Sequence, residues 1–163
     1  SAAAAPNAGW WSVQAGTNDV TLLPTNTVDQ ITTRLRTIVE RGLASGVKVI
    51  LWTLPPRNNA TDTGSWADYS SAIVSAGSTV TLQRQKQMAV NAWIRRYATE
   101  TSGVVLADPF DQLVDPSSAT GDWKSGMNTT SDGVHWSDKG AFVAGQVAAA
   151  AVRPHLKDRK SVV

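Results

Sequence analysis

The hydrophobic and polar positions of this chain divide it into short apolar runs and longer stretches of helical period. Three apolar runs, at residues 10–15, 47–54 and 104–107, predict β-strands. The run at 47–54 is apolar almost throughout, which is typical of a strand that is covered on both faces in a parallel sheet. Pro55 and Pro56 follow it, and because proline cannot donate to a sheet ladder, they end this strand.

Three helices are predicted between and after these strands. Apolar side chains recur at helical spacing at Val28, Ile31, Leu35, Ile38, Val39 and Leu43, and then at Ala89, Val90, Trp93, Ile94 and Tyr97 within 82–98. In the third helix, Phe142, Val143, Val147 and Ala151 are expected to form the buried face. Thr27 and Gln30 have the spacing of a capping box before the first helix, and Gly46 is expected to end it. Ser137 is expected to cap the third helix, which Pro154 stops.

The predicted elements follow the order strand, helix, strand, helix, strand, helix. This alternation predicts an α/β fold with a parallel sheet and right-handed crossovers. No internal repeat or linker interrupts the chain, so we expect residues 1–163 to form a single domain. The polar segment 58–78 is expected to be a long excursion of the kind that is often functional. Ligands of such sheets bind outside the carboxyl ends of the strands.

Composition excludes several kinds of site and partner. The chain contains no cysteine, so disulfides, thiolate metal sites and a cysteine nucleophile are excluded. Its formal net charge of +2 is too small to indicate a nucleic-acid partner. No stretch approaches the roughly 20 consecutive apolar residues that span a bilayer. The seven tryptophans favour large aromatic side chains in the core over a sugar-binding surface.

Two short motifs carry the candidate chemistry. Asp132 lies three residues before His135, so that its carboxylate could accept the imidazole Nδ1–H and leave Nε2 to act as a base. Asn18 and Asp19 end the motif Gly-Thr-Asn-Asp, which directly follows the first strand. Because both motifs follow strands of a parallel sheet, we expect them at one edge. Taken singly, each motif could equally be an ordinary turn or the lead into a helix.

In these residues the chain resembles the SGNH hydrolases, also called the GDSL family of esterases and lipases. The resemblance is carried by Gly16-Thr17-Asn18-Asp19, by Asp132-Gly133-Val134-His135, and by Gly46-Val47-Lys48-Val49-Ile50-Leu51 leading to Pro55-Pro56. It implies a partial flavodoxin-like sheet, flanked by helices as an α/β/α sandwich. That family's sheet has the order 2-1-3-4-5, and only strands 3, 4 and 5 are visible here. The first strand of this chain would therefore lack a neighbour, and pairing with a missing N-terminal segment is expected.

The resemblance also implies roles for particular residues. His135 would be the general base, and Asp132 would orient it and stabilise its cation. Asn18 would donate its side-chain amide to the oxyanion, with Gly16 and Asp19 in supporting positions. The family's nucleophilic serine lies in a Gly-Asp-Ser block that this chain lacks, so the nucleophile is unknown. No metal or other cofactor is implied.

The sequence therefore predicts a serine-type ester hydrolase that acts on a small-molecule or polysaccharide ester. An acetylated sugar is one such substrate, with Trp66, Trp123 and Trp136 as candidate wall residues. One alternative is a non-catalytic binding or structural module, although the presence of both motifs counts against it. Another is a zinc site that uses His135, Asp132 and Asp138, which the single nearby histidine disfavours. Many members of the family are exported, which favours an extracellular or envelope location.

Overall fold

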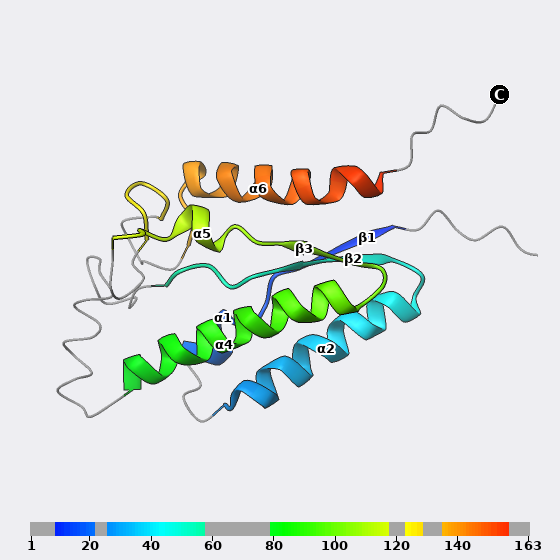
Figure 1. Cartoon of the computed structure of the whole chain (residues 1–163), viewed down its shortest axis with the longest axis horizontal. Coiled ribbons are helices and arrows are strands. Elements are labelled where there is room, and N and C mark those ends of the chain that lie inside the picture. The colour runs from blue at the N-terminus through cyan, green and yellow to red at the C-terminus, as the bar shows by residue number, and fades with distance from the viewer. Residues whose placement is uncertain (1–8, 22–25, 58–78, 118–122, 129–134, 157–163) are drawn as a thin grey trace, which may run out of the picture.

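A three-stranded parallel sheet lies at the centre of the computed structural model (Figure 1). The structure describes residues 9–21, 26–57, 79–117, 123–128 and 135–156. The strands are β1 (Trp10–Val13), β2 (Lys48–Trp52) and β3 (Val104–Ala107), in this order across the sheet. Val13 lies beside Leu51, which lies beside Leu106. The predicted parallel sheet and its strand order are confirmed.

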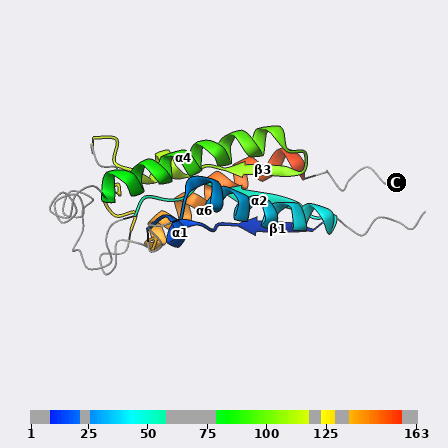
Figure 2. The same cartoon turned by 90° about the horizontal axis from the view of Figure 1, so that it is seen from below.

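Helices cover both faces of this sheet (Figures 1 and 2). Helices α2 (Val28–Ala44) and α4 (Thr79–Glu100) pack together on one face, and α6 (Asp138–Val152) crosses the other face over β3. Shorter elements follow the longer ones: α1 (Thr17–Thr21) after β1, α5 (Phe110–Leu113) after β3, and the 3-10 helix η1 (Arg153–His155) after α6. Among the described helices, none combines the length and the apolar character needed to cross a bilayer.

The main core lies between the sheet and helices α2 and α4. Its buried side chains include Leu35 and Val39 from α2, Val49 and Leu51 from β2, and Val90 and Ile94 from α4. Alternate residues of a strand face opposite sides of a sheet. Val49 and Leu51 therefore face the two helices, whereas Ile50 and Trp52 face the α6 side. Burying a side chain of this size contributes roughly 1.5–3 kcal/mol, so this layer dominates the stability of the fold.

The helix boundaries follow the capping signals of the sequence. The hydroxyl of Thr27 accepts a hydrogen bond from the Gln30 backbone N–H at 3.2 Å, and the Gln30 side chain accepts one from the Thr27 N–H at 2.9 Å. After α2, Gly46 has a φ of 79°, which favours glycine. Ser137 caps α6 by accepting a hydrogen bond from the Gly140 N–H at 3.0 Å. The capping predictions for both helices are confirmed.

The buried face predicted for α6 is partly wrong, and the apolar stripe of α4 is buried only in part. Phe142 was expected to be buried, but it is 68% exposed, and α6 instead buries Ala144 and Ala148. The small side chains let the helix lie close to β3. On α4, Ala89 is exposed, and the buried face includes the polar side chain of Asn91. Hydrophobic spacing alone could not reveal a buried amide, because its burial depends on partners from another element.

Asn91 joins α4 to the segment that follows β2. Its side chain is fully buried, and its Oδ1 accepts a hydrogen bond from the Leu54 backbone N–H at 2.7 Å. Its Nδ2 donates to the Leu54 carbonyl at 3.0 Å. One turn earlier on α4, the Gln87 side chain donates to the carbonyl of Pro55. Two side chains of α4 therefore fix the backbone beyond the carboxyl end of β2.

Asn91→Leu is expected to lower the free energy of unfolding by about 2–5 kcal/mol. Leucine has nearly the same volume, but it leaves the buried N–H and C=O of Leu54 unpaired, and each unpaired group costs about 1–3 kcal/mol. Urea denaturation measures the loss. Gln85→Leu, at an exposed position of the same helix, is the control and should change stability by less than about 0.5 kcal/mol. Equal unfolding midpoints for the two variants would contradict the prediction.

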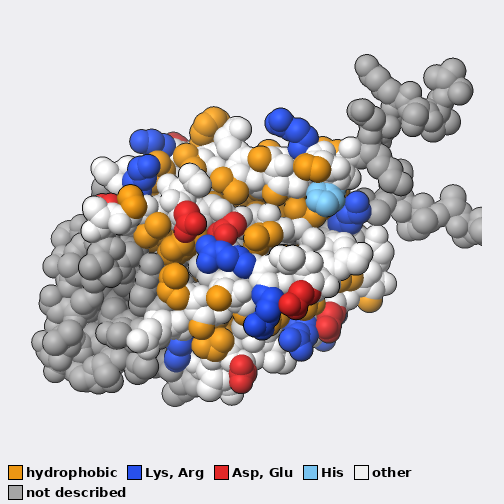
Figure 3. Space-filling view, viewed as in Figure 1, with side chains coloured by type: hydrophobic (Ala, Val, Ile, Leu, Met, Phe, Trp, Pro, Cys, Tyr) orange, Lys and Arg blue, Asp and Glu red, His pale blue; other side chains and the backbone are white. Residues whose placement is uncertain are grey.

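A second polar cluster ties the ends of β2 and β3 to α4. Arg95 donates to both carboxylate oxygens of Asp108, from Nε at 2.6 Å and from Nη2 at 3.0 Å. Thr53 donates its hydroxyl to the same carboxylate at 2.8 Å. These bonds to Asp108 raise the pKa of Arg95 above its usual value. On the face seen in Figure 3, basic and acidic side chains are intermixed, and no large patch of one sign stands out.

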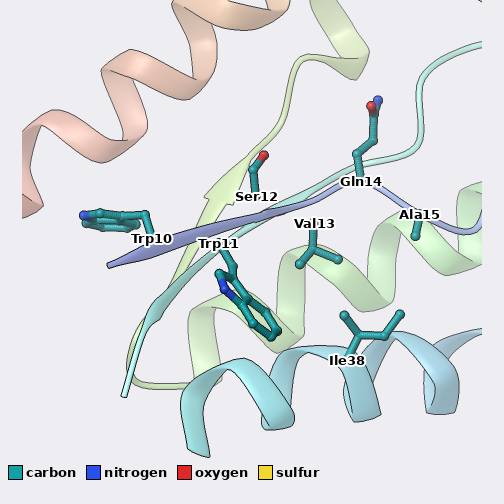
Figure 4. Close-up of a pocket in the computed structure, with 7 residues that line it drawn as sticks. All are labelled: Trp10, Trp11, Ser12, Val13, Gln14, Ala15 and Ile38. Atoms are coloured by element: carbon teal, nitrogen blue, oxygen red, sulfur yellow. The ribbon is translucent and has the colours of Figure 1, made fainter. Parts of the chain in front are cut away.

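Strand β1 lies at one edge of the sheet. It pairs with β2 on one side, and no described strand lies on its other side. A shallow hollow of about 450 Å³ runs along this edge, and Trp11 and Ile38 in its lining are 43% and 39% exposed. Figure 4 shows Trp11 and Val13 pointing towards α2, with Ser12 and Gln14 pointing towards the opposite face. As far as the described residues extend, this edge therefore has no partner strand, and it presents apolar side chains.

Candidate active site

A hollow at the carboxyl ends of β1 and β2 is lined by residues of both sequence motifs. Its volume is about 450 Å³, and its lining residues are Gln14, Ala15, Gly16, Thr17, Asn18, Asp19, Pro55, His135 and Trp136. They come from the segment after β1, the turn after β2 and the segment before α6. Asn18 and His135, which lie far apart in the sequence, thus share one hollow. This is the edge at which ligands bind in open parallel sheets.

Gly16 sets the direction of the chain between β1 and α1. Its φ of 107° is a conformation that other residues rarely adopt. A Cβ atom at this position would also contact the side chains of Ile31 and Leu54, at 3.5 and 3.6 Å. The Gly16 carbonyl accepts a hydrogen bond from the Val20 N–H at 3.0 Å, which starts α1. The buried Val20 anchors this short helix, so that Asn18 lies at the hollow.

The amide of Asn18 is oriented by Arg57. Nη1 of Arg57 donates to Oδ1 of Asn18 at 2.7 Å, and Arg57 is only 6% exposed. Because Oδ1 is the acceptor in this bond, the other branch of the amide is the donor Nδ2. Nδ2 has no hydrogen-bond partner among the described residues. The arrangement leaves Asn18 with a donor for a ligand in the hollow.

Asp19 forms hydrogen bonds with residues in α2 and just before its start. Its Oδ1 accepts hydrogen bonds from Nη1 of Arg34 at 2.6 Å and from Nδ2 of Asn26 at 3.3 Å. Arg34 also donates to Oδ1 of Asn26 at 3.4 Å. Asp19 therefore has contacts that anchor α1 to α2, which suits the supporting position expected for it.

The segment that carries His135 is anchored through its neighbours. His135 itself is exposed, and Trp136 is half-buried. The ring of Trp136 lies 5.9 Å from the ring of Trp52 on β2, centroid to centroid. The Trp52 indole N–H in turn donates to the hydroxyl of Ser12 on β1 at 2.8 Å. The residue next to His135 is thus held against β2, at a tryptophan that also bonds β1.

Several predicted site residues lie outside the described residues. They include Asp132 and Trp66. The contact of Asp132 with His135 and the alternative zinc site therefore remain predictions. Within the described ranges, no cluster of three or more His, Cys, Asp or Glu side chains could hold a metal ion. Trp123 is described, but the prediction that it forms a wall of the site is wrong. It is 6% exposed and packs against Leu113 and Met127 in a small separate core.

Comparison with known proteins identifies relatives by structure. No model of a protein family matches the chain, and no curated protein sequence matches it. A GDSL-like lipase from Bacteroides thetaiotaomicron superposes with a TM-score of 0.68 at 20% sequence identity over 89% of this chain. A proposed acylhydrolase from Bacteroides fragilis gives 0.68 at 21% identity over 91%. The chain spans only 62% and 63% of these two proteins. It therefore has the C-terminal part of an SGNH (GDSL-type) hydrolase fold.

Proposed function

We propose that this chain supplies the general base and an oxyanion donor of a serine ester hydrolase. The observation that carries the proposal is that Asn18 and His135 line one hollow, in a fold shared with a GDSL-like lipase. Acyl transfer needs a base that removes a proton from the nucleophile and a donor for the charge that forms on the carbonyl oxygen. An imidazole and an amide at one hollow supply these two functions.

In the proposed reaction, Nε2 of His135 takes the proton of a serine hydroxyl while the serine oxygen attacks the ester carbonyl carbon. The carbonyl oxygen becomes an oxyanion, and the Nδ2–H of Asn18 donates a hydrogen bond to it. The intermediate then collapses, and His135 returns the proton to the departing alcohol. A water molecule then attacks the carbonyl carbon of the acylated serine while His135 takes its proton. The bond to the serine oxygen breaks, His135 returns the proton to that oxygen, and the acid is released. Asp132 is proposed to accept the Nδ1–H of His135 and to stabilise the imidazolium.

The nucleophilic serine is proposed to lie on a further polypeptide segment that pairs with β1 and completes one domain with residues 1–163. Two observations support this. The outer side of β1 has no described partner strand, and Trp11 and Ile38 offer apolar surface along it (Figure 4). A parallel strand added there would end beside Gly16, at the edge where the hollow lies.

The proposed substrate is a short-chain ester, such as an acetyl group on a sugar or polysaccharide. The hollow is open and lies at the surface, so a bulky alcohol part could remain outside while the acyl group enters. Of the three tryptophans predicted as wall residues, Trp136 is the described one that lines the hollow. Its half-buried indole supports the proposal, because an indole combines a flat apolar face with a polar N–H.

A serine-reactive fluorophosphonate probe tests the proposed function. The protein is produced together with any residues that its gene encodes before Ser1, and the labelled peptide is identified by mass spectrometry. We expect hydrolysis of p-nitrophenyl acetate and one labelled serine outside residues 1–163. A labelled serine within these residues would contradict the proposed position of the nucleophile. Absence of both labelling and hydrolysis would instead favour a non-catalytic module.

A further inference from the structure

Arg57 is a buried cation beside the hollow. It is 6% exposed, although arginine is rarely buried unless it is paired. Its Nη1 donates to Oδ1 of Asn18 at 2.7 Å, across the gap between the turn after β2 and α1. No step of the proposed reaction uses Arg57. Its burial against the side chain proposed as the oxyanion donor therefore points to an indirect role.

The backbone that carries Arg57 is rigidly held. Asn91 bonds both the N–H and the C=O of Leu54, and Gln87 donates to the carbonyl of Pro55. Pro55 and the following proline each fix one backbone dihedral angle. The packing of α4 on the end of β2 thus fixes the backbone just before Arg57. A mobile surface arginine would not offer a defined bond to Asn18.

We infer that Arg57 is a positioning residue that sets the orientation of the Asn18 amide, an inference whose catalytic part rests on the proposed function. An asparagine amide can rotate by 180° and exchange its oxygen and nitrogen with little steric change. That rotation would present an acceptor where the oxyanion requires a donor. The guanidinium can only donate, so it accepts no bond from the NH₂ group and holds the oxygen instead. Its charge also polarises the amide and strengthens the Nδ2–H as a donor.

Kinetics of the active protein test the catalytic part of this inference. Arg57→Met is expected to lower kcat about 10–100-fold, less than the 10²–10³-fold typical of losing an oxyanion donor outright. KM should change little, because the bond from Asn18 matters only once the oxyanion forms. In an Asn18→Ala background, the same substitution should have less than about a 3-fold further effect, because the bond to the Asn18 amide is already gone. Effects that multiply fully in the double variant would overturn the inference.

Arg95→Met is the matched control. It removes an arginine that also makes short hydrogen bonds, but to Asp108 after β3, and neither Arg95 nor Asp108 lines the hollow. We expect it to lower thermal stability and to leave kcat of the folded protein unchanged. A loss of kcat as large as that of Arg57→Met would show that general destabilisation explains both, and would overturn the inference.

NMR of the Asn18 side-chain amide tests the positioning without any activity measurement. In protein labelled with ¹⁵N-asparagine, Arg57→Met should shift the Nδ2 resonances and speed their exchange with water, whereas Arg95→Met should not. Unchanged Asn18 resonances in Arg57→Met would overturn the inference even if the protein is an active esterase. Changed resonances in a protein that neither hydrolyses esters nor reacts with the phosphonate would support the positioning and refute the proposed function alone.

Discussion

His135→Ala is expected to lower kcat for ester hydrolysis by about 10²–10⁴-fold, the usual contribution of a general base. Without the imidazole, the serine hydroxyl keeps its proton at neutral pH and is a poor nucleophile. KM should change little, because proton transfer belongs to the transition state. The measurement is steady-state hydrolysis of p-nitrophenyl acetate by the protein that contains the nucleophile, together with the rate of phosphonate labelling.

The second histidine of the chain provides the control. His155 lies in η1, and its ring lies edge-on to the ring of Trp10, with centroids 6.4 Å apart. Trp10 begins β1, so His155 lies at the end of the strand opposite to the hollow. His155→Ala should therefore leave both rates unchanged. Similar losses in the two variants would contradict the role of His135 as the base.

Gly140→Ala is expected to lower the free energy of unfolding by about 3 kcal/mol, at the upper end of the usual range for overpacking. Gly140 lies in the first turn of α6, and a Cβ atom there would overlap the carbonyl oxygen of Met127. That carbonyl also accepts the backbone N–H of Ser137 at 3.0 Å. No side-chain rotation can relieve a clash with backbone, so the start of α6 must move. Urea denaturation measures the loss.

Gly145→Ala, on the same helix, is the matched control. A Cβ atom at this exposed position meets nothing within 4 Å. Alanine favours the helix over glycine by roughly 0.5–1 kcal/mol, so this variant should gain stability. The two Gly→Ala substitutions are thus expected to act in opposite directions. If both raise stability, the close approach of α6 to Met127 is absent.

The sheet and the long helices could be predicted because their signals are local. Apolar runs, helical spacing and capping residues such as Thr27 and Ser137 each act within a few positions, and together they determine the order of the elements. The short helices α1 and α5 were not predicted, because four or five residues are too few to display a period. The wrong prediction for Phe142 has a different cause, since its exposure depends on how closely α6 approaches β3.

The sequence predicted which motifs of the candidate site share one edge of the sheet, but not the side-chain contacts between them. Parallel strands bring the segments that follow them to one edge, and the hollow that Asn18 and His135 share lies there. Arg57 was missed, because its importance arises from a bond to a side chain that lies 39 positions earlier in the chain. The one available signal was a cation placed directly after two prolines at the end of a strand. Trp123 shows the opposite error, since an aromatic residue in a loop can equally fill a small core.

The two hydrogen bonds between Asn91 and Leu54 affect the backbone next to the hollow, because Pro55, the residue after Leu54, lines it. The side-chain amide of Asn91 pairs with both the N–H and the C=O of Leu54, as the backbone of a neighbouring strand would. A helix thus supplies the hydrogen bonds that a strand would otherwise make. The backbone can leave the sheet at Leu54 while its buried N–H and C=O both remain hydrogen-bonded. This side of the hollow would therefore be preorganised, with its backbone already fixed before a substrate binds.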